Sequence, residues 1–372
     1  MTALPGAGVG VGVIGGGFMA QMHSRSALLA GARLAGVTAS SPESSARAAQ
    51  RLGFERGYGS LEELLADRTI DVVHVCTPNA LHAEQASAVI ASGRDVVCEK
   101  PLATTVAAAT ALTEQAAAAN VTATVPFVYR FHPLVREARE RVARGETGRL
   151  LTVAASYLQD WLLTSEDDNW RVDTDLGGAS RAFADIGSHL VDLVEFVTND
   201  RITRIAGRTR TFVTDRAHHE QVTNEDAAAI VVETASGAIG TLLVSQVAPG
   251  RKNRLHLEIA GSAQSLAFDQ EHPETLWIGR RRGSELLPRD ADQNSDAANR
   301  YSVAPGGHPQ GYPEAFASFV ADSYAAARGQ EIDGLPTFAD GLRAAVVTDA
   351  VLRAAQTDGW VDIPTPFRGE RS

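Results

Sequence analysis

Short apolar runs alternate with helix-compatible segments along the first third of the chain. A β-branched run ends at Ile14, the three glycines at 15–17 follow it, and residues 18–30 are helix-compatible. The same alternation predicts strands over 33–39, 72–75, 95–98 and 122–125, with helices over 44–52, 61–66, 80–91 and 106–119. Continuous apolar strands separated by helices are typical of a parallel sheet covered on both faces. With right-handed crossovers, this pattern predicts a doubly wound Rossmann domain.

From about residue 150 the pattern changes to strands that have no helices between them. Leu255, Leu257 and Ile259 alternate with polar residues, which is the period-two pattern of a strand with one face on a core. The predicted strands cover 150–158, 201–211, 228–234, 239–246 and 255–260. Because these strands follow one another directly, we expect a mainly antiparallel sheet.

The segments after these strands are predicted to be a loop and two amphipathic helices. The charged stretch 280–311, rich in proline and glycine, is predicted to be a long loop or flap. Apolar residues then recur on one helix face near 312–320 and again near 338–346. The change of pattern predicts two domains in an α/β fold, with limits at 1–130 and 131–372.

The composition is that of an ordinary globular protein, with 44% apolar and 21% charged residues. Lysine and arginine number 34 against 45 acidic residues, and the net charge of −11 argues against nucleic acid or an anionic membrane as the main partner. No apolar run approaches the roughly 20 residues of a membrane span, and the first residues do not resemble a signal peptide. Cys76 and Cys98 lie in apolar runs and are interpreted as buried thiols, so we expect a cytoplasmic protein.

The glycine-rich turn carries the first chemical signal. Gly15, Gly17 and Ala20 have the G-x-G-x-x-A spacing with which a strand, a turn and a helix N-terminus hold a pyrophosphate. The alternative is an ordinary glycine-rich turn at the start of an α/β domain. At the end of the second predicted strand, Ser40 and Ser41 stand where an acid selects NAD or an arginine accommodates NADP. Since no arginine adjoins the strand, NAD is the expected cofactor and NADP the alternative.

Two further loops follow the carboxyl ends of predicted strands, at 77–79 and 99–101, where ligands of parallel sheets bind. Lys100 lies in the second loop. The ordinary interpretation of Lys100 is a solvated surface charge. The functional alternative is an ammonium that faces the cofactor, because Pro101 restricts the backbone that orients the side chain. His74, in contrast, lies inside a predicted buried strand and is interpreted as a core residue.

A tryptophan-containing loop carries the second chemical signal. Trp161, Trp170 and Arg171 are residue types that bind a sugar ring by stacking and hydrogen bonding, although packing is the alternative for each tryptophan. Asp185 and His189 are four residues apart, so if a helix begins near Asp185, both side chains project from one face of it. A carboxylate beside an imidazole supports proton transfer, whereas a helix-terminal acid and a structural histidine form the alternative. Since no third ligand has suitable spacing, we expect no metal.

These motifs, in this order and spacing, resemble the Gfo/Idh/MocA oxidoreductases, named for glucose–fructose oxidoreductase and inositol dehydrogenase. The similarity runs from VGVIGGG through EKP and ADIGSHLVDL to GGHPQGYPEAF. The stretches QDWLL, NWR, GGASRA and DIGSH look most like the branch of levoglucosan dehydrogenase and related pyranoside dehydrogenases. The resemblance implies an N-terminal NAD(P)-binding Rossmann domain and a C-terminal substrate-binding and oligomerisation domain with an open, mostly antiparallel sheet. Val128 departs from the asparagine that many members have before Tyr-Arg.

The resemblance further implies a dehydrogenase that oxidises a secondary hydroxyl of a sugar, anhydrosugar or inositol by hydride transfer to nicotinamide. The family's catalytic residues correspond to Lys100, Asp185 and His189. His189 is expected to take the hydroxyl proton, Lys100 to stabilise the charge on the same oxygen, and Asp185 to position the substrate. A homodimer or homotetramer is also implied. The alternatives are a non-catalytic NAD(P)-binding regulator and a glycosidase that uses NAD in a redox-assisted elimination.

The expected binding residues gather in two sets. The cofactor contacts are Gly15, Gly17, Phe18, Met19, Ser40, Ser41, Thr77, Pro78, Asn79, His82, Glu99 and Lys100. The substrate contacts are Lys100, Arg130, Trp161, Trp170, Arg171, Asp185 and His189. The expected partner is therefore a small sugar or polyol, with no nucleic acid and no membrane.

Overall fold

The computed structural model describes residues 4–364, which form two compact units. The first unit consists of residues 4–128 and 312–342, and the second consists of residues 129–311 and 343–364. The predicted limit at 130 lies close to the boundary between residues 128 and 129. The sequence pattern had grouped 312–342 with the second domain, because nothing in an amphipathic helix says which sheet its apolar face will cover.

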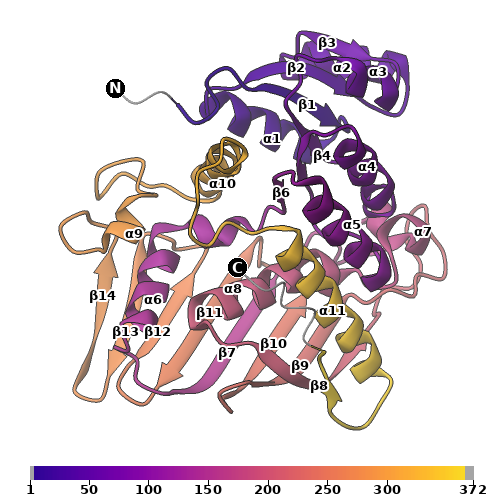
Figure 1. Cartoon of the computed structure of the whole chain (residues 1–372). Helices are drawn as coiled ribbons and strands as arrows, with labels where there is room; N and C mark the ends of the chain where they lie inside the picture. Colours follow the sequence, from indigo (N-terminus) through magenta and orange to yellow (C-terminus); the bar gives the residue numbers. More distant parts are fainter. Residues whose placement is uncertain (1–3, 365–372) are drawn as a thin grey trace. The chain divides into compact units, whose positions relative to one another are not determined.

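The first unit contains a six-stranded sheet in the order β3-β2-β1-β4-β5-β6 (Figure 1). Every pairing in it is parallel, and the order turns back at β1 and β4, as in a doubly wound fold. The strands are β1 Gly10–Ile14, β2 Arg33–Thr38, β3 Arg56–Tyr58, β4 Val72–Val75, β5 Asp95–Cys98 and β6 Ala123–Thr124. The predicted Rossmann fold is confirmed, and only the three-residue β3 was missed.

Six helices of the first unit connect or cover these strands: α1 Phe18–Leu29, α2 Pro42–Leu52, α3 Leu61–Ala66, α4 Asn79–Ala91, α5 Val106–Ala119 and α10 Tyr312–Ala327. Local sequence sets their ends. Ser41 and Thr105 accept backbone N–H bonds as N-caps of α2 and α5, and Asn120 ends α5 in the left-handed region. Helix α10 packs against α1 and buries Phe319 and Tyr324, which is why it belongs to this unit.

The second unit contains a nine-stranded sheet in the order β14-β13-β12-β11-β7-β10-β9-β8-β15. Its strands are β7 Leu150–Leu158, β8 Ile202–Arg210, β9 Ala227–Thr234, β10 Ile239–Ser245, β11 Arg254–Gly261, β12 Ser265–Asp269, β13 Thr275–Arg280, β14 Gly283–Pro288 and β15 Val361–Asp362. Strands β7 and β10 pair in parallel, and the other pairings of this sheet are antiparallel. The predicted mainly antiparallel sheet is confirmed.

The prediction of a loop or flap over 280–311 is wrong for part of that stretch. Strand β14 pairs with β13, and a short helix, α9 Asp296–Asn299, follows. Strand β14 lies at the edge of the sheet and is almost wholly exposed, with only Leu287 buried. An edge strand of this kind has no alternation of buried and exposed residues, so hydrophobic periodicity gives no signal for it.

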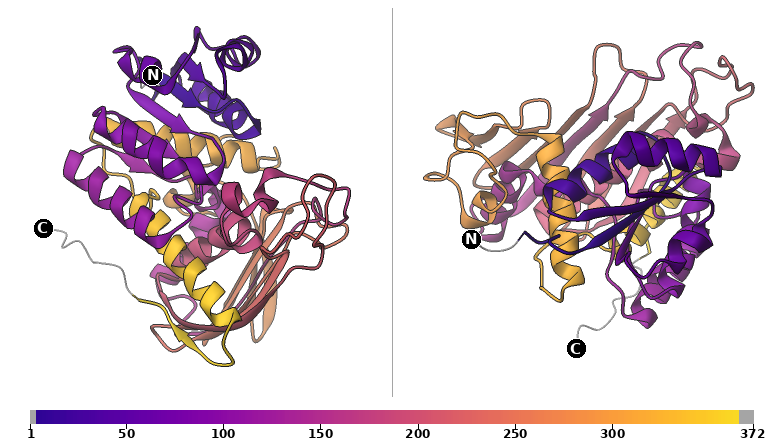
Figure 2. Two further views of the ribbon diagram at one scale, coloured as in Figure 1. Left: turned by 90° about the vertical axis from the view of Figure 1, so that its right-hand side faces the viewer. Right: turned by 90° about the horizontal axis from the view of Figure 1, so that it is seen from above.

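The long helices of the second unit lie on one face of its sheet (Figures 1 and 2). Those on this face are α6 Pro133–Ala143, α8 Ser188–Thr198 and the larger part of α11 Phe338–Ala355, and the unit also contains two short helices, α7 Thr174–Gly177 and α9. Helices α6 and α8 contact the strands, whose inward side chains, such as Val153, Leu242 and Leu257, are buried. None of the helices within residues 4–364 is long and apolar enough to cross a membrane.

Candidate functional site

The glycine turn after β1 is shaped to receive an anionic group. Gly15 has φ +111°, and a Cβ there would lie 2.7 Å from the Cys76 carbonyl oxygen, so only glycine fits. Gly17 caps α1, and a Cβ there would meet nothing within 4 Å. The first helical bond runs from Gln21 N–H to the Gly17 carbonyl, so earlier N–H groups are left for a phosphate. Those N–H groups belong to Phe18, Met19 and Ala20.

Two serines follow β2 at the position that selects the cofactor. Ser41 forms a capping box with Ser44, accepting its N–H at 3.2 Å while the Ser44 hydroxyl accepts the Ser41 N–H at 2.8 Å. Ser40 is exposed beside them. Arg51 in α2 donates a hydrogen bond to the Gly16 carbonyl, which puts a positive charge beside the glycine turn. Sequence reasoning did not single out Arg51, because no motif links it to the turn.

The loops 77–79 and 99–101 follow β4 and β5, which are neighbours in the sheet. His82 ties them together: Nδ1 lies 2.8 Å from the Pro101 carbonyl oxygen and Nε2 lies 2.9 Å from that of Thr77. The imidazole is 1% exposed, and burial lowers the pKa of His82 while the two carbonyls oppose that shift. His82 therefore lies between the loops that carry the other predicted cofactor contacts, with a carbonyl oxygen of each loop close to one ring nitrogen. A neutral imidazole has a single N–H and donates it to one of these carbonyls at a time.

Glu99 is buried directly before Lys100. One carboxylate oxygen lies 3.0 Å from His23 Nε2, and the other accepts the backbone N–H of Lys100 at 3.0 Å. Burial alone raises the pKa of Glu99, but the hydrogen bond from His23 and the nearby positive charges lower it overall. The next peptide bond, Lys100–Pro101, is cis. Glu99 thus faces inward as a carboxylate and anchors the backbone of Lys100.

A π-helical turn at Phe183–Gly187 leads directly into α8 and carries Asp185 and His189 within one helical segment. A helix beginning near Asp185 is therefore confirmed. A Cβ on Gly187 would lie 2.6 Å from the Phe183 ring, so the turn depends on glycine. Single π-turns are frequent at functional sites. Asp185 and His189 are 9% and 6% exposed, so each can present only a small part of its side chain to a ligand.

Asp185 gathers several of the predicted substrate contacts. Gln246 Nε2 donates to one carboxylate oxygen at 2.8 Å, and Arg171 Nε lies 3.5 Å from the other. The Arg171 guanidinium stacks on Trp170, 4.4 Å from the ring centroid, and lies 5.9 Å from that of Trp161. Two tryptophan faces, a cation and a carboxylate are thus brought together. Sequence reasoning missed Gln246, whose only signal is that it directly follows β10.

His189 packs against two tyrosines that sequence reasoning also missed. The Tyr129 ring lies edge-on at 5.2 Å between centroids, and that of Tyr157 at 6.4 Å. The two phenol groups hydrogen-bond to each other. Tyr157 also donates to Asn253 Oδ1 at 2.7 Å, and Asn253 Nδ2 donates to Tyr129 at 3.2 Å. Burial raises the pKa of Tyr129 to about 12, so its phenol stays protonated beside the imidazole.

These residues meet because of the strand directions. Strands β7 and β10 are parallel and end together, while their antiparallel neighbours begin there: Leu158 pairs with Arg254 of β11, and Ser245 pairs with Ala227 of β9. Polar residues flank all four strands at this end of the sheet: Gln159, Asn224, Gln246 and Asn253. Aromatic faces beside amides and charges suit a ligand that has both C–H faces and hydroxyl groups.

Arg130, a predicted substrate contact, is engaged elsewhere in the second unit. Its Nε donates to Asp192 Oδ2 at 2.8 Å, a second guanidinium nitrogen bonds the other carboxylate oxygen, and the guanidinium lies over the Phe196 ring. The side chain is only 7% exposed. The bidentate ion pair with Asp192 is a structural role for Arg130. The contact of Arg130 with a substrate stays a prediction.

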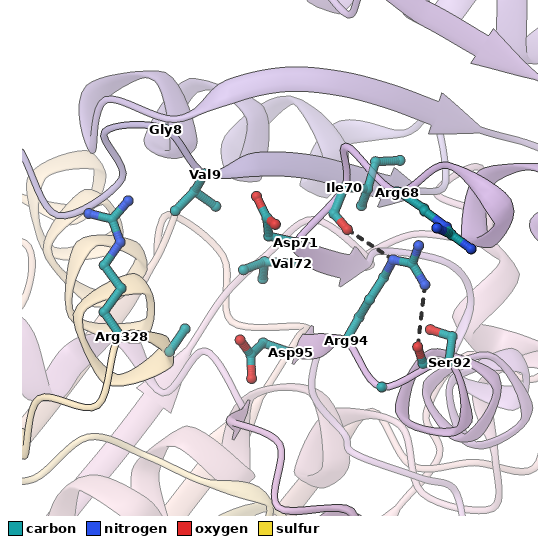
Figure 3. Close-up of a pocket in the computed structure, with 12 residues that line it drawn as sticks. Gly8, Val9, Arg68, Ile70, Asp71, Val72, Ser92, Arg94, Asp95 and Arg328 are labelled. Atoms are coloured by element: carbon teal, nitrogen blue, oxygen red, sulfur yellow. Dashed lines mark hydrogen bonds between the residues drawn. The ribbon is translucent and has the colours of Figure 1, made fainter.

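A hollow of about 580 Å³ lies at the opposite edge of the parallel sheet, at the amino ends of β1, β4 and β5 (Figure 3). Two of its charged residues are bonded to the backbone: Asp71 accepts the Gly10 N–H at 2.7 Å, and Arg94 donates to the Ile70 carbonyl at 2.9 Å. Ligands of doubly wound sheets bind at the carboxyl ends, so this hollow is not the predicted site. Within residues 4–364, no three His, Cys, Asp or Glu side chains are grouped to hold a metal ion.

Known proteins match both units. Residues 9–127 match the oxidoreductase family with an NAD-binding Rossmann fold, and residues 135–267 match the GFO/IDH/MocA C-terminal domain. Levoglucosan dehydrogenase of Pseudarthrobacter phenanthrenivorans is 30% identical, over 95% of this chain and 98% of its own. An oxidoreductase domain protein from Kribbella flavida superimposes with a TM-score of 0.89 at 36% identity, over 96% of this chain and 100% of that one. An inositol dehydrogenase homolog from Azotobacter vinelandii, solved with NADH and myo-inositol, gives 0.87 at 27% identity, over 96% and 98%.

The π-turn yields a stability prediction. Helix propensity alone favours alanine over glycine by about 1 kcal/mol, but the Cβ of Gly187→Ala would collide with the buried Phe183 ring. We expect Gly187→Ala to lower the free energy of unfolding by about 1–3 kcal/mol in a denaturant titration. The control is Gly359→Ala, at an exposed glycine with nothing within 4 Å of its Cβ, which should change it by less than about 0.5 kcal/mol. Wild-type stability of Gly187→Ala would show that the turn tolerates a side chain.

Proposed function

Because this chain belongs to the GFO/IDH/MocA oxidoreductase family, we propose that it oxidises a secondary hydroxyl of a sugar, anhydrosugar or inositol, with NAD as the hydride acceptor. The observation that carries the proposal is the cluster at one end of the nine-stranded sheet. There, Asp185 is held by Arg171 and Gln246, with Trp170 stacked on the guanidinium. A polyol ring offers hydroxyl groups to the polar atoms of this cluster and C–H faces to the indoles.

The first unit has the features that NAD requires. The backbone at Gly15 and Gly17, with the first turn of α1, would hold the pyrophosphate. The hydroxyl groups of Ser40 and Ser41 would face the adenosine ribose. The loops 77–79 and 99–101 would lie near the nicotinamide, which accepts a hydride at C4 when the cofactor is bound.

In the proposed reaction, the substrate carbon loses a hydride while its hydroxyl loses a proton, so that a carbonyl forms. His189 takes the proton as general base, and its ring is held in place by Tyr129 and Tyr157. The Lys100 ammonium donates a hydrogen bond to the same oxygen and stabilises the negative charge that grows on it. Asp185 accepts a hydroxyl of the substrate and orients the ring. The reverse reaction would use the same groups for carbonyl reduction.

The test is a panel of sugars, anhydrosugars and inositols, each assayed with NAD and with NADP for absorbance at 340 nm. We expect NADH to form with at least one polyol. His189→Ala should lower kcat by about 10²- to 10⁴-fold, and Lys100→Ala by about 10²- to 10³-fold, with NADH affinity retained. The matched control is His218→Ala, at an exposed histidine of the same unit, which should keep wild-type turnover.

The other outcomes identify the alternatives. Near-wild-type turnover of His189→Ala would remove the base assignment. Cofactor binding without turnover of any polyol would favour a non-catalytic regulator. Cleavage of a glycoside with cofactor that stays bound and no net NADH would favour a redox-assisted glycosidase.

We also propose that the protein is a cytoplasmic homodimer or homotetramer that assembles through the outer face of the nine-stranded sheet. None of the described helices covers this face, and it exposes Val231, Ile239 and Leu243, at 43%, 57% and 45%. Ile239 and Leu243 point to the same side as Val231, because Val231 pairs with the residue between them. Exposed apolar patches of this kind are typical of interfaces. The buried free thiols of Cys76 and Cys98 suit a reducing compartment.

Light scattering coupled to gel filtration tests this assembly. Wild-type protein should elute as a dimer or tetramer, and Leu243→Glu should dissociate it, because the interface would then bury an unpaired carboxylate. The control is Leu29→Glu in α1, where the leucine is 58% exposed, and it should leave the assembly unchanged. A monomeric wild-type protein, or an intact oligomer of Leu243→Glu, would contradict the proposal.

A further inference from the structure

A line of buried polar side chains runs through the first unit to Glu99. The Tyr324 hydroxyl of α10 lies 2.9 Å from His74 Nε2 in β4. His74 Nδ1 lies 2.7 Å from His23 Nδ1 in α1, and His23 Nε2 lies 3.0 Å from Glu99 Oε1. His23, His74 and Tyr324 are 0% exposed and Glu99 is 4% exposed. The interpretation of His74 as a core residue is therefore confirmed, but it is a core residue with hydrogen bonds at both ring nitrogens.

The donors in this line can be assigned from its two ends. Glu99 is a carboxylate and can only accept, so His23 donates from Nε2. Burial lowers the pKa of His74 well below its ordinary value, so that ring is neutral and has a single N–H. The Tyr324 hydroxyl is fully buried, and within residues 4–364 its hydrogen-bond partner is His74 Nε2, so its proton lies there. His74 therefore carries its N–H on Nδ1 and donates from there to His23 Nδ1. His74 Nε2 is then an acceptor. Burial raises the pKa of Tyr324 far above its ordinary value, so its hydroxyl donates to His74. Every bond then runs in one direction, from Tyr324 to Glu99.

The line ends on the backbone of Lys100. The second oxygen of Glu99 accepts the Lys100 N–H at 3.0 Å, and on the other side His82 Nδ1 lies 2.8 Å from the Pro101 carbonyl oxygen. Buried side chains therefore contact the backbone on both sides of the Lys100 side chain: Glu99 at the Lys100 N–H and His82 at the Pro101 carbonyl. The mechanism above uses Lys100 but none of Tyr324, His74 and His23.

We propose that Tyr324, His74, His23 and Glu99 form a directed hydrogen-bond relay that positions Lys100 for catalysis. Tyr324 is then a positioning residue that acts through three other side chains, and the α10 segment contributes to the active site without touching substrate. The positioning role rests on the function proposed above, whereas the direction of the bonds does not. Because a buried hydrogen-bonded chain fixes the tautomer of each imidazole, removing its first donor should loosen the whole line.

Tyr324→Phe removes that donor and keeps the ring. We expect kcat for the polyol to fall on the order of tenfold, because small displacements of a catalytic group are costly, while KM and NADH affinity change less than about twofold. In ¹⁵N spectra of histidine-labelled protein, wild-type His74 should carry its proton on Nδ1 and His23 on Nε2. Tyr324→Phe should lose this fixed pair of tautomers.

Glu99→Gln is the second variant. Its amide would place an NH₂ group against either the His23 N–H or the Lys100 N–H, both of which are donors. We therefore expect a larger loss of kcat than for Tyr324→Phe, about 10²-fold, with NADH still bound.

The matched control is Ser323→Ala, next to Tyr324 in α10. Ser323 is also buried, and its hydroxyl bonds the Phe319 carbonyl at 3.0 Å and the Thr124 hydroxyl at 3.1 Å, outside the relay. It should lower the melting temperature about as much as Tyr324→Phe while leaving kcat and the histidine tautomers unchanged. A loss of kcat in Ser323→Ala equal to that in Tyr324→Phe would show that both act only through stability.

The histidine spectra and the NADH-binding measurements need no polyol. If no polyol is oxidised, the proposed function is rejected, but these measurements still test the direction of the hydrogen bonds. Wild-type His74 protonated on Nε2 would overturn the relay. Tyr324→Phe with wild-type kcat would overturn the positioning role.

Discussion

Parallel strands end at the same edge of a sheet, and this constraint gathers the candidate site residues in both units. In the first unit, β1, β4 and β5 end side by side and present the glycine turn, the Thr77 loop and Lys100. In the second, the parallel pair β7 and β10 does the same for Gln159 and Gln246. Residues that are far apart in the sequence thus become neighbours, and the loops can vary without disturbing the sheets.

Two buried carboxylates hold the candidate site residues in place, one in each unit. Glu99 faces inward, is bonded to His23, and anchors the backbone of Lys100. Asp185 is bonded to Gln246 and lies beside Arg171. A carboxylate out of water is stable only with donors or positive charge around it, so each acid dictates the residues that surround it. The residues proposed to act on the substrate are therefore held by networks of buried hydrogen bonds, and these networks include residues that are not expected to contact the substrate.

Hydrophobic periodicity and local motifs predicted the Rossmann sheet, the mainly antiparallel sheet and the helix that begins near Asp185. The family resemblance, drawn from the glycine turn, EKP and DIGSH, is confirmed by the matches to both units. Periodicity gave no sign of β14, an exposed edge strand, nor of the unit to which α10 belongs. Tyr157 and Gln246 lack a local motif, because only the pairing of β7 with β10 brings them to one end of the sheet. Tyr129 lies in a 3₁₀ turn, Val128–Phe131, and its contact with His189 forms only in the folded chain.

Hydride transfer itself is tested most directly with a polyol deuterated at the carbon that is oxidised. If hydride passes directly from the polyol to the cofactor, each turnover moves one deuterium to C4 of the nicotinamide, giving deuterated NADH by mass spectrometry, with none released to water. Slower turnover of the deuterated polyol would show that this transfer limits the rate. Deuterium found in the solvent, or product formed without deuterated NADH, would exclude direct hydride transfer from the polyol to the cofactor.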